Sequence, residues 1–503
     1  MDLDAKRFTD GTTLETDVCI IGAGPAGLVL ASELTRDQRN VILLESGGRR
    51  PESAIRALND GDLTGDVYAG LGATRHRQVG GTSNLWNTSL GSAAAAKYAP
   101  LDAPDFEARD GMEHSGWPFA FADLLGDYER AQRVCGLGPF RYDGADWARP
   151  NAEPWADLGE AVVSRVYQAG RREAFLTRLL ETIVSSPTAR LVTHATVVGL
   201  HRGAAARDVT HVSVSTPGGA LWHVRADIVV LAAGAVENAR LLLVSDDGTG
   251  SFGNRSGWVG RGFMEHPRDC ALTLRPRSAA LYERSGFYDS SRAEDGTWVV
   301  GRIAVASDAL SSGALLNASA TLFPRLTATA RGVRAMMPAV AHRWLPGEGH
   351  GWSRRRTARR VFDGFTVLLN VEQPPHPENR VTLSARRDSL GVPLPALHWR
   401  WSPDDHRRLE RVRALVAGSI EGVGAVSVDA SAIPDPNAHH HAGTTRMAHD
   451  PSRGVADAHG CVHGTENLYV TGASTFPTAG FANPMLTIVA LAIRLARHLA
   501  RER

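Results

Sequence analysis

The chain has 503 residues, of which 43% are hydrophobic and 22% charged, which is typical of a globular protein with room for two or three domains. Its 55 lysines and arginines nearly balance its 54 aspartates and glutamates, so the charge gives no reason to expect nucleic acid or an anionic membrane as a partner. No apolar run is as long as a bilayer requires, and no apolar signal segment precedes the first predicted strand, so we expect no membrane contact and a cytoplasmic location.

Residues 17–48 have the pattern of a βαβ unit that binds a dinucleotide. Two short apolar runs, 18–21 and 41–44, predict buried strands, and residues 28–34 predict a helix between them. The connecting turn is expected to contact the cofactor through Gly22, Gly24, Pro25, Ala26 and Gly27. Glu45 follows the second strand, where a carboxylate can accept hydrogen bonds from both ribose hydroxyls of an adenosine. This unit alone does not distinguish NAD from FAD.

Residues 70–92 are dense in Gly, Ser, Thr and Asn, which disfavours both helix and strand. Such a stretch suits a loop that lies closely along a ligand, and the pair Gly80 and Gly81 together with Trp86 favours this interpretation. The alternative is a long surface loop.

Residues 101–185 have a mixed character with two amphipathic helices expected, over 121–137 and 175–183. Strands are expected over 191–200, 209–214 and 226–231, and the last leads through Ala233 and Gly234 into a helix. This second junction of strand, glycine and helix lies too far along the chain to belong to the first βαβ unit. We therefore expect a dinucleotide domain formed from separate segments of the chain.

The region 271–430 contains alternating apolar and polar runs typical of an antiparallel sheet with one wet face. Residues 331–360 interrupt it with an arginine cluster, which we interpret as a solvated face, and with glycines and tryptophans that could form a mobile cover. Near the end, 467–471 predicts another strand. Asn483 and Pro484 then stand where an N-cap and the first position of a buried helix belong.

The order of the motifs resembles the glucose-methanol-choline (GMC) family of FAD-dependent alcohol oxidoreductases. The resemblance is carried by GAGPAG with Glu45, VGGTSNLW at 79–86, AAGAVENARLLL at 232–243, VGRGFMEHP at 259–267, VEQPPHPENRVTLS at 371–384, HHAGTTRM at 440–447 and FPTAGFANPMLT at 476–487. It favours FAD over NAD. Within the family, the GGTS and ANP stretches are most similar to pyranose oxidases and bacterial glycoside 3-oxidases.

The resemblance implies a two-domain fold. An α/β Rossmann-like FAD domain of the glutathione-reductase type is expected from residues 1–100, 186–270 and 431–503. An α+β substrate domain on a largely antiparallel sheet is expected from 101–185 and 271–430. Further cofactor contacts are expected at Ser46, Arg77, Gly80, Gly81, Thr82, Asn84, Leu85, Trp86, Val197, Ala233, Gly234, Gly472, Ala473, Asn483, Pro484 and Met485.

The family's HxxGT pattern is met by His440, Gly443 and Thr444, which implies that His440 is the base that takes the hydroxyl proton. Asn483 occupies the second family position, where an amide N–H can bond the substrate oxygen. Alternatives are a polar loop or a metal ligand for the triple histidine 439–441, and a simple helix cap for Asn483.

Two further residues, Gln373 and His441, are weak candidates for substrate contact, whereas His266 and His449 are expected to serve structure or substrate entry. Fungal pyranose oxidases carry a flavin-bonding histidine where this chain has Leu85, so noncovalent FAD is expected. The four cysteines are scattered without metal or redox spacing, and no metal site is expected.

The implied reaction is oxidation of a secondary hydroxyl, at C3 or C2 of a pyranose or of a C- or O-glycoside, to a keto-sugar, with reduction of O2 to H2O2. Alternatives are a dehydrogenase that passes electrons to a quinone or another acceptor, an enzyme acting on a nonsugar alcohol, and a flavin-binding protein without turnover. The sequence leaves the sugar, the electron acceptor and the oligomeric state open.

Overall fold

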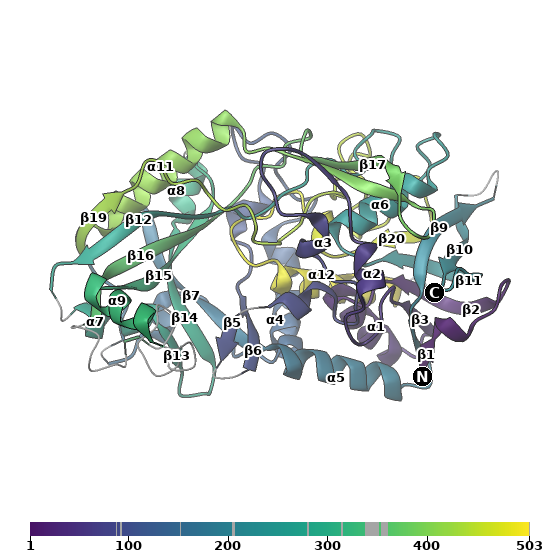
Figure 1. Cartoon of the computed structure of the whole chain (residues 1–503), viewed down its shortest axis with the longest axis horizontal. Helices are drawn as coiled ribbons and strands as arrows, with labels where there is room; N and C mark the ends of the chain where they lie inside the picture. The colour runs from purple at the N-terminus through teal and green to yellow at the C-terminus, as the bar shows by residue number, and fades with distance from the viewer. Residues whose placement is uncertain are drawn as a thin grey trace.

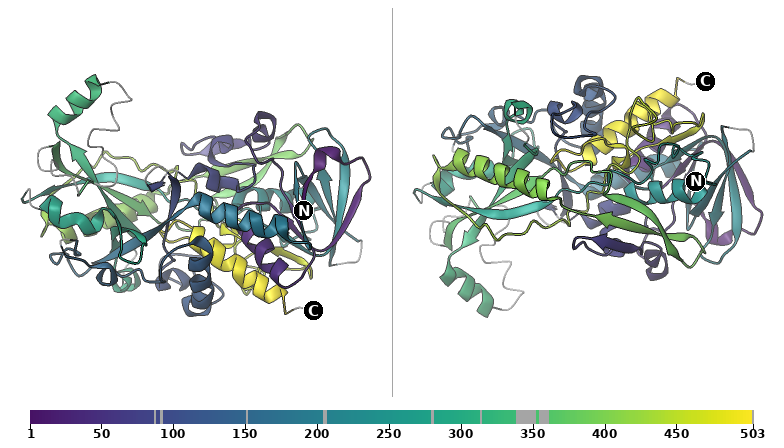
Figure 2. Two further views of the ribbon diagram at one scale, coloured as in Figure 1. Left: turned by 90° about the horizontal axis from the view of Figure 1, so that it is seen from below. Right: turned by 90° about the horizontal axis from the view of Figure 1, so that it is seen from above.

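The structure is a computed structural model that describes the chain except for residues 87, 91–92, 151, 204–206, 279–280, 313–314, 338–351, 354–360 and 502–503. The described residues form two lobes, each built around one large sheet (Figure 1). Both termini lie on the lobe that contains the first βαβ unit, as the two further views also show (Figure 2). The expected fold class, a Rossmann-like domain with a second domain on an antiparallel sheet, is confirmed.

The first lobe contains an eight-stranded sheet. Its order is β1 (Asp2–Asp4), β8 (Ala189–Thr193), β3 (Val41–Leu44), β2 (Thr13–Ile21), β11 (Leu221–Leu231), β10 (Val209–Ser215) and β9 (Thr196–Arg202), with β20 (Leu468–Val470) beside β11. The strands from β1 to β11 and β20 run parallel, and β10 and β9 run antiparallel. The carboxyl ends of β2, β3, β11 and β20 therefore meet at one edge, which is where ligands bind in parallel sheets.

Helices cover this sheet and join distant parts of the chain. They are α1 (Pro25–Arg36), α4 (Phe121–Cys135), α5 (Arg172–Ser185), α6 (Ala235–Ser245) and α12 (Met485–Leu499). The first and last of them pack together, α12 also packs against α4, and α1 against α5. Segments from both halves of the chain thus contribute to one layered domain.

The segment 191–200, expected to be one strand, contributes to two strands, β8, which is second from one end of this sheet order, and β9, which is at the other end. The chain changes direction at His194, whose φ of 55° lies in the left-handed region. Its ring nitrogens contact Asp4 Oδ1 at 2.8 Å and Glu52 Oε1 at 2.6 Å, and these contacts hold the turn. An uninterrupted apolar pattern does not reveal such a corner.

The second lobe contains a nine-stranded antiparallel sheet. Its order is β19 (Gly424–Val428), β12 (Arg268–Pro276), β16 (Phe362–Val371), β15 (Ala318–Leu326), β14 (Trp298–Val305), β7 (Val162–Arg171), β6 (Ala93–Tyr98) and β5 (Thr88–Leu90), with β13 (Ser290–Arg292) beside β14. The long helix α11 (Pro403–Ile420) packs against β12 and β19 (Figure 1). Shorter helices are α7 (Leu281–Arg284), α8 (Ser307–Ser312) and α9 (Ala328–Met336).

Strand pairing differs from the expected domain division at two places. Residues 88–98 were expected in the first domain, but β5 and β6 extend the sheet of the second lobe through β7. Conversely, β17 (Arg380–Arg387) and β18 (Pro393–Trp399) form a separate three-stranded sheet with β4 (Asp62–Gly65) and pack against α6. Hydrogen-bonding partners far apart in sequence decide these memberships.

The stretch 50–68 contains β4 and the helix α2 (Ser53–Ala57), and α3 (Leu71–Thr74) follows. Most of the expected cover, including the arginine cluster 354–360, lies outside the described residues. Trp352 is described and is buried against Phe365, with the two ring centroids 4.9 Å apart.

The last helix begins at Met485, and its N-cap position is occupied by Pro484 rather than by Asn483. The expected capping bond from Asn483 is absent, and that side chain faces His440 instead. The helix is buried along most of its length, as its nearly all-round apolar surface predicts. None of the described helices combines the length and the apolar composition needed to cross a membrane.

Gly27 determines how closely α1 approaches the end of β2. A Cβ built on Gly27 would lie 1.9 Å from the carbonyl oxygen of Gly22, so a side chain here forces the helix away from the strand. A Cβ on Gly24 would meet no atom within 4 Å, and its φ of −74° is open to any residue. The two glycines therefore have different tasks.

We predict that Gly27→Ala destabilises the protein by about 1–3 kcal/mol or more, because the added methyl overpacks the helix-strand contact. The measurement is thermal unfolding without added cofactor. Gly24→Ala is the matched control and should keep the melting temperature of the cofactor-free protein while weakening binding of the expected FAD. Equal melting temperatures for the two variants would contradict this assignment.

Candidate active site

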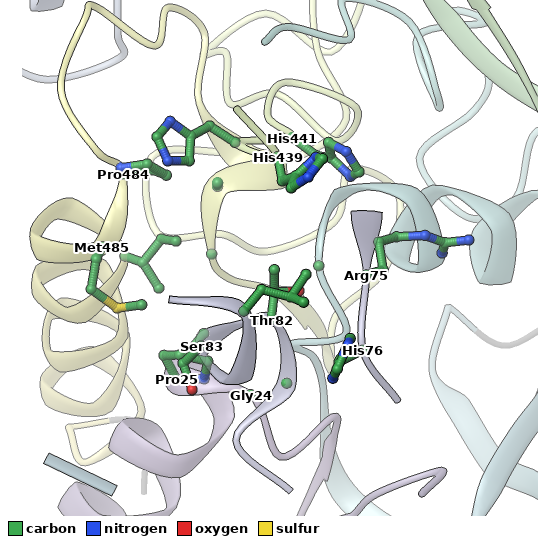
Figure 3. Close-up of a pocket in the computed structure, with 18 of the residues that line it drawn as sticks. Gly24, Pro25, Arg75, His76, Thr82, Ser83, His439, His441, Pro484 and Met485 are labelled. Atoms are coloured by element: carbon green, nitrogen blue, oxygen red, sulfur yellow. The ribbon is translucent and has the colours of Figure 1, made fainter. Parts of the chain in front are cut away.

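A cavity of about 1080 Å³ lies between the two large sheets. One side is formed by the carboxyl ends of β2, β3, β11 and β20, and the other by residues of β6, β14, β15 and β16. Figure 3 shows Gly24 and Pro25 at one end, Thr82 in the middle, and His439 and His441 at the far end. A single space therefore joins the dinucleotide edge to the histidine loop.

Most residues expected at the site line this cavity. They are Gly22, Gly24, Pro25, Ala26, Glu45, Ser46, Arg77, Gly81, Thr82, Leu85, Trp86, Val197, Ala233, Gly234, His440, His441, Gly472, Ala473, Asn483, Pro484 and Met485. They come from parts of the chain that are distant in sequence, and strand ends, the 3-10 helix Gly81–Leu85 and the start of α12 bring them together.

Four expected residues lie outside the lining. Gly27 faces the carbonyl of Gly22, and Gly80 makes the left-handed turn that starts the 3-10 helix, with φ 93°. The Asn84 amide donates to the carbonyls of Val79 and Gly81 and so stabilises its own loop. Gln373 is fully buried, and its role is structural, as described below.

Other lining residues were not among the expected site residues. They include Asn59, Arg75, His76, Lys97, Arg268, Trp298, Phe323, Asn370 and His439. Several stand on strands of the second lobe, whose inward face becomes known only with the strand register. Residues 93–98, which form β6, were expected in the first domain.

The nucleotide end of the cavity has the cradle that a dinucleotide needs. Space is open above the backbone at Gly24, and also at Gly234, whose φ is 85°. Glu45 closes the end of β3, where its carboxylate accepts hydrogen bonds from Ala23 N at 3.0 Å and Gly47 N at 2.9 Å. Burial raises the pKa of Glu45, while these two N–H groups oppose the rise.

A buried ion cluster lies beside this cradle. Glu237 binds the guanidinium groups of Arg75, Arg77 and Arg240. Burial alone would raise the pKa of Glu237, but the three cations hold it well below the ordinary range. The carboxylate therefore stays charged and keeps Arg75 and Arg77 at the cavity wall.

At the histidine end, a chain of hydrogen bonds joins three side chains. His266 Nε2 lies 3.2 Å from the carbonyl oxygen of Ala479, which can only accept, so Nε2 carries the proton. His266 Nδ1 is then an acceptor for His440 Nδ1–H at 2.9 Å. This assignment leaves a lone pair on His440 Nε2, which lies 3.1 Å from Asn483 Nδ2.

Burial keeps these imidazoles neutral. It lowers the pKa of His440 well below the ordinary histidine value, and His266 and Arg268 lower it further. Burial likewise lowers the pKa of His266 to about 4. Near neutral pH the His440 ring is therefore an unprotonated acceptor at Nε2.

Glu265 holds the loop that carries His440. Its Oε2 accepts from His440 N at 3.0 Å, and its Oε1 accepts from the Tyr68 hydroxyl at 2.6 Å. Gln373, expected to be a substrate contact, accepts from Glu265 N at 2.9 Å and from Trp399 Nε1 at 3.0 Å. It therefore supports Glu265 from behind and does not reach the cavity.

The HxxGT pattern has a physical reason in this loop. Gly443 has φ 88°, and a Cβ there would lie 2.1 Å from the carbonyl oxygen of Gly262. Thr444 donates its hydroxyl to Ala235 O at 2.6 Å, which ties the loop to the start of α6. Within the described residues, no three His, Cys, Asp or Glu side chains are arranged to hold a metal ion.

Comparison with known families agrees with this geometry. A family model described as GMC oxidoreductase matches residues 375–492, and one described as an FAD binding domain matches residues 15–95. The chain therefore contains a GMC oxidoreductase C-terminal domain and an FAD-binding domain. It is an FAD-dependent enzyme that acts on CH–OH groups, and the cradle at Gly24 and Glu45 suits this cofactor.

Among known relatives, 6'''-hydroxyparomomycin C oxidase of Streptomyces lividus is 26% identical over 97% of this chain and 92% of the relative. A C-glycoside 3-oxidase of Arthrobacter globiformis is 36% identical, but over 25% of each chain. The structure of an FAD-dependent oxidoreductase from Chaetomium thermophilum superposes with a TM-score of 0.57 and 17% identity, covering 97% of this chain and 99% of that one. Identity this low establishes the fold alone.

We predict that Glu237→Gln lowers the free energy of unfolding of the protein by about 3–5 kcal/mol, because it leaves the buried Arg75 and Arg77 without a carboxylate partner, whereas Arg240 keeps Asp388. Glu410→Gln is the control, since Glu410 is largely exposed and its partner Arg413 keeps Asp269. Glu410→Gln should change the free energy of unfolding by no more than about 1 kcal/mol. Similar melting temperatures for both variants would contradict the structural role of Glu237.

Proposed function

We propose that the protein is a sugar oxidase, which converts a secondary hydroxyl at C3 or C2 of a pyranose, or of a C- or O-glycoside, to a ketone and passes the electrons to O2 as H2O2. The observation that carries the proposal is the pair His440 Nε2 and Asn483 Nδ2, 3.1 Å apart at the cavity wall. One atom is a proton acceptor and the other a donor. FAD, when bound, supplies the two-electron acceptor.

In the proposed reaction the substrate oxygen replaces the direct contact between these two atoms. His440 Nε2 takes the hydroxyl proton, and the Asn483 amide N–H bonds the oxygen as negative charge develops on it. His266 keeps His440 in the required tautomer, because its own Nε2–H is held by Ala479 O. The Nδ1 lone pair of His266 is occupied by His440 Nδ1–H, so His266 does not compete for the proton.

A sugar substrate is supported by the composition of the remaining wall. Trp298 and Phe323 provide aromatic faces for the C–H groups of a pyranose, and the Asn370 amide provides donors and an acceptor for its hydroxyls. The names of two relatives, a hydroxyparomomycin oxidase and a C-glycoside 3-oxidase, point in the same direction. The choice of C3 follows the second relative, whose match covers a quarter of the chain.

Noncovalent FAD is part of the proposal, because Leu85 lines the cavity and its side chain has no nucleophilic atom. We predict that acid or heat denaturation releases the flavin quantitatively, so that the supernatant is yellow and the precipitated protein colourless. The measurement is flavin absorbance in the two fractions. Flavin that stays with the polypeptide would refute this part of the proposal.

We predict that His440→Ala slows flavin reduction by about 10²–10⁴-fold, because the hydroxyl loses its base. Asn483→Ala should slow it by about 10²–10³-fold, because the developing charge loses a donor. Both variants should fold and retain FAD. The measurement is anaerobic reduction of the flavin by a panel of sugars and glycosides.

His449→Ala is the matched control for His440, since His449 is exposed on the same segment. Its rate should equal that of the unmodified protein. Oxygen consumption compared with dye reduction then separates an oxidase from a dehydrogenase. Near-normal flavin reduction in His440→Ala would remove this residue from the mechanism.

A further inference from the structure

The cavity wall opposite the dinucleotide edge is one face of the nine-stranded sheet. The strand register pairs Lys97 with Ala169 and Ala169 with Trp298, so their side chains point to the same face. The register also pairs Thr321 with Leu368 and Phe323 with Thr366, so these side chains share a face. Lys97, Phe323 and Leu368 all line the cavity. Figure 1 shows β6, which carries Lys97, at the junction between the two lobes.

Lysine and arginine stand on this face at Lys97, Arg165, Arg268 and Arg302. Two of these cations are paired with aspartates, since β-bridges place Asp143 beside Arg165 and Asp435 beside Arg268. The cavity-lining carboxylates among the described residues, Glu45 and Glu237, belong to the other lobe. The substrate side of the cavity therefore has one sign of charge.

Lys97 differs from the other cations of this face. Its Nζ lies 5.8 Å from the ring centroid of Tyr167 and 5.7 Å from that of Phe323. Arg268 lines the cavity too, but it forms an ion pair with Asp435, and Arg302 is buried between the rings of Tyr167 and Phe481. Among the described residues, no carboxylate forms an ion pair with Lys97.

An ammonium group in this position is costly for the protein by itself. Burial lowers the pKa of Lys97 to about 8, and no neighbouring charge contributes to the shift. Aromatic rings at nearly 6 Å compensate only part of the lost hydration. A methionine or leucine would fill the same space at a lower cost, so the charge indicates a ligand that needs it.

We propose that the substrate carries a carboxylate that pairs with Lys97, as in a uronic acid or its glycoside. The inference rests on the proposed sugar oxidation and names the class of sugar. Trp298 and Phe323 contact the ring, while the acid group enters the cationic end of the cavity. A polycationic amino sugar would be repelled by the same face.

The test compares 4-nitrophenyl β-D-glucuronide with 4-nitrophenyl β-D-glucoside, which differ in the carboxylate. Anaerobic flavin reduction gives a second-order rate constant for each, and their ratio measures the preference for the acid. We expect a ratio of about 10–100 for the unmodified holoenzyme, the range for a charge-assisted hydrogen bond. In Lys97→Met the ratio should fall to nearly one, and Lys97→Arg should retain most of it.

Arg165→Met is the control, because Arg165 stands on the same sheet face but pairs with the exposed Asp143. Arg165→Met should keep the ratio of the two rate constants. This result distinguishes an ion pair between Lys97 and the substrate from an electrostatic effect of all the cations on the sheet. In the unmodified enzyme the preference should also decline above about pH 8, as Lys97 loses its proton. The carboxylate stays ionised over that range.

Three outcomes would overturn the inference. The neutral glycoside could be preferred with the ratio unchanged in Lys97→Met, and the proposed sugar oxidation would then still stand. Lys97→Met could slow only the reaction of the reduced flavin with O2. If neither glycoside reduces the flavin, the proposed sugar oxidation fails. Titration with D-glucuronate, followed by flavin absorbance, then tests the anion site separately. Loss of D-glucuronate binding in Lys97→Met supports the anion site, and equal binding in the variant and the unmodified enzyme overturns it.

Discussion

The arrangement of the active site depends on one buried hydrogen-bond chain, from the carbonyl of Ala479 through His266 and His440 to the amide of Asn483. Its members come from the segment before β12, from the loop after β19 and from the segment before α12. A backbone carbonyl can only accept, so it sets the proton on His266 and, through it, the tautomer of His440. Burial then keeps both rings neutral. The hydrogen-bond chain therefore fixes Nε2 as the atom of His440 that accepts a proton.

The two lobes give the cavity two electrostatic environments. On the dinucleotide side, Glu237 is balanced by Arg75, Arg77 and Arg240, so the charges are largely satisfied within the protein. On the other side, the sheet face contributes cations, and Lys97 reaches the cavity without an ion-pair partner among the described residues. Charges satisfied by the protein maintain its structure, whereas an unsatisfied charge at a cavity wall is available to a ligand. This contrast distinguishes the cofactor side from the substrate side.

Sequence reasoning succeeded where the physical cause is local. The glycine turn with Glu45 and the HxxGT loop can be read from a few consecutive residues, because each glycine answers a backbone requirement: Gly27 a close contact and Gly443 a positive φ. It failed where partners that are distant in sequence decide the role of a side chain. Gln373 looked like a substrate contact but supports Glu265. For Asn483 the sequence left a helix cap open beside the expected role at His440, and the side chain makes no capping bond and faces His440. Either role is compatible with the residue type alone, and the partner selects between them.

The amino-acid sequence by itself determined the dinucleotide unit, the family, the cofactor and the two residues that meet at the proposed reaction centre, since each depends on short-range patterns. Only the tertiary structure decided the membership of β5 and β6 in the second sheet, the separate sheet of β4, β17 and β18, and the position of Lys97 at the cavity. Strand neighbours and register set these features. A one-residue shift in register would turn every side chain of a strand to the opposite face, so the substrate wall becomes defined only when the sheet has formed.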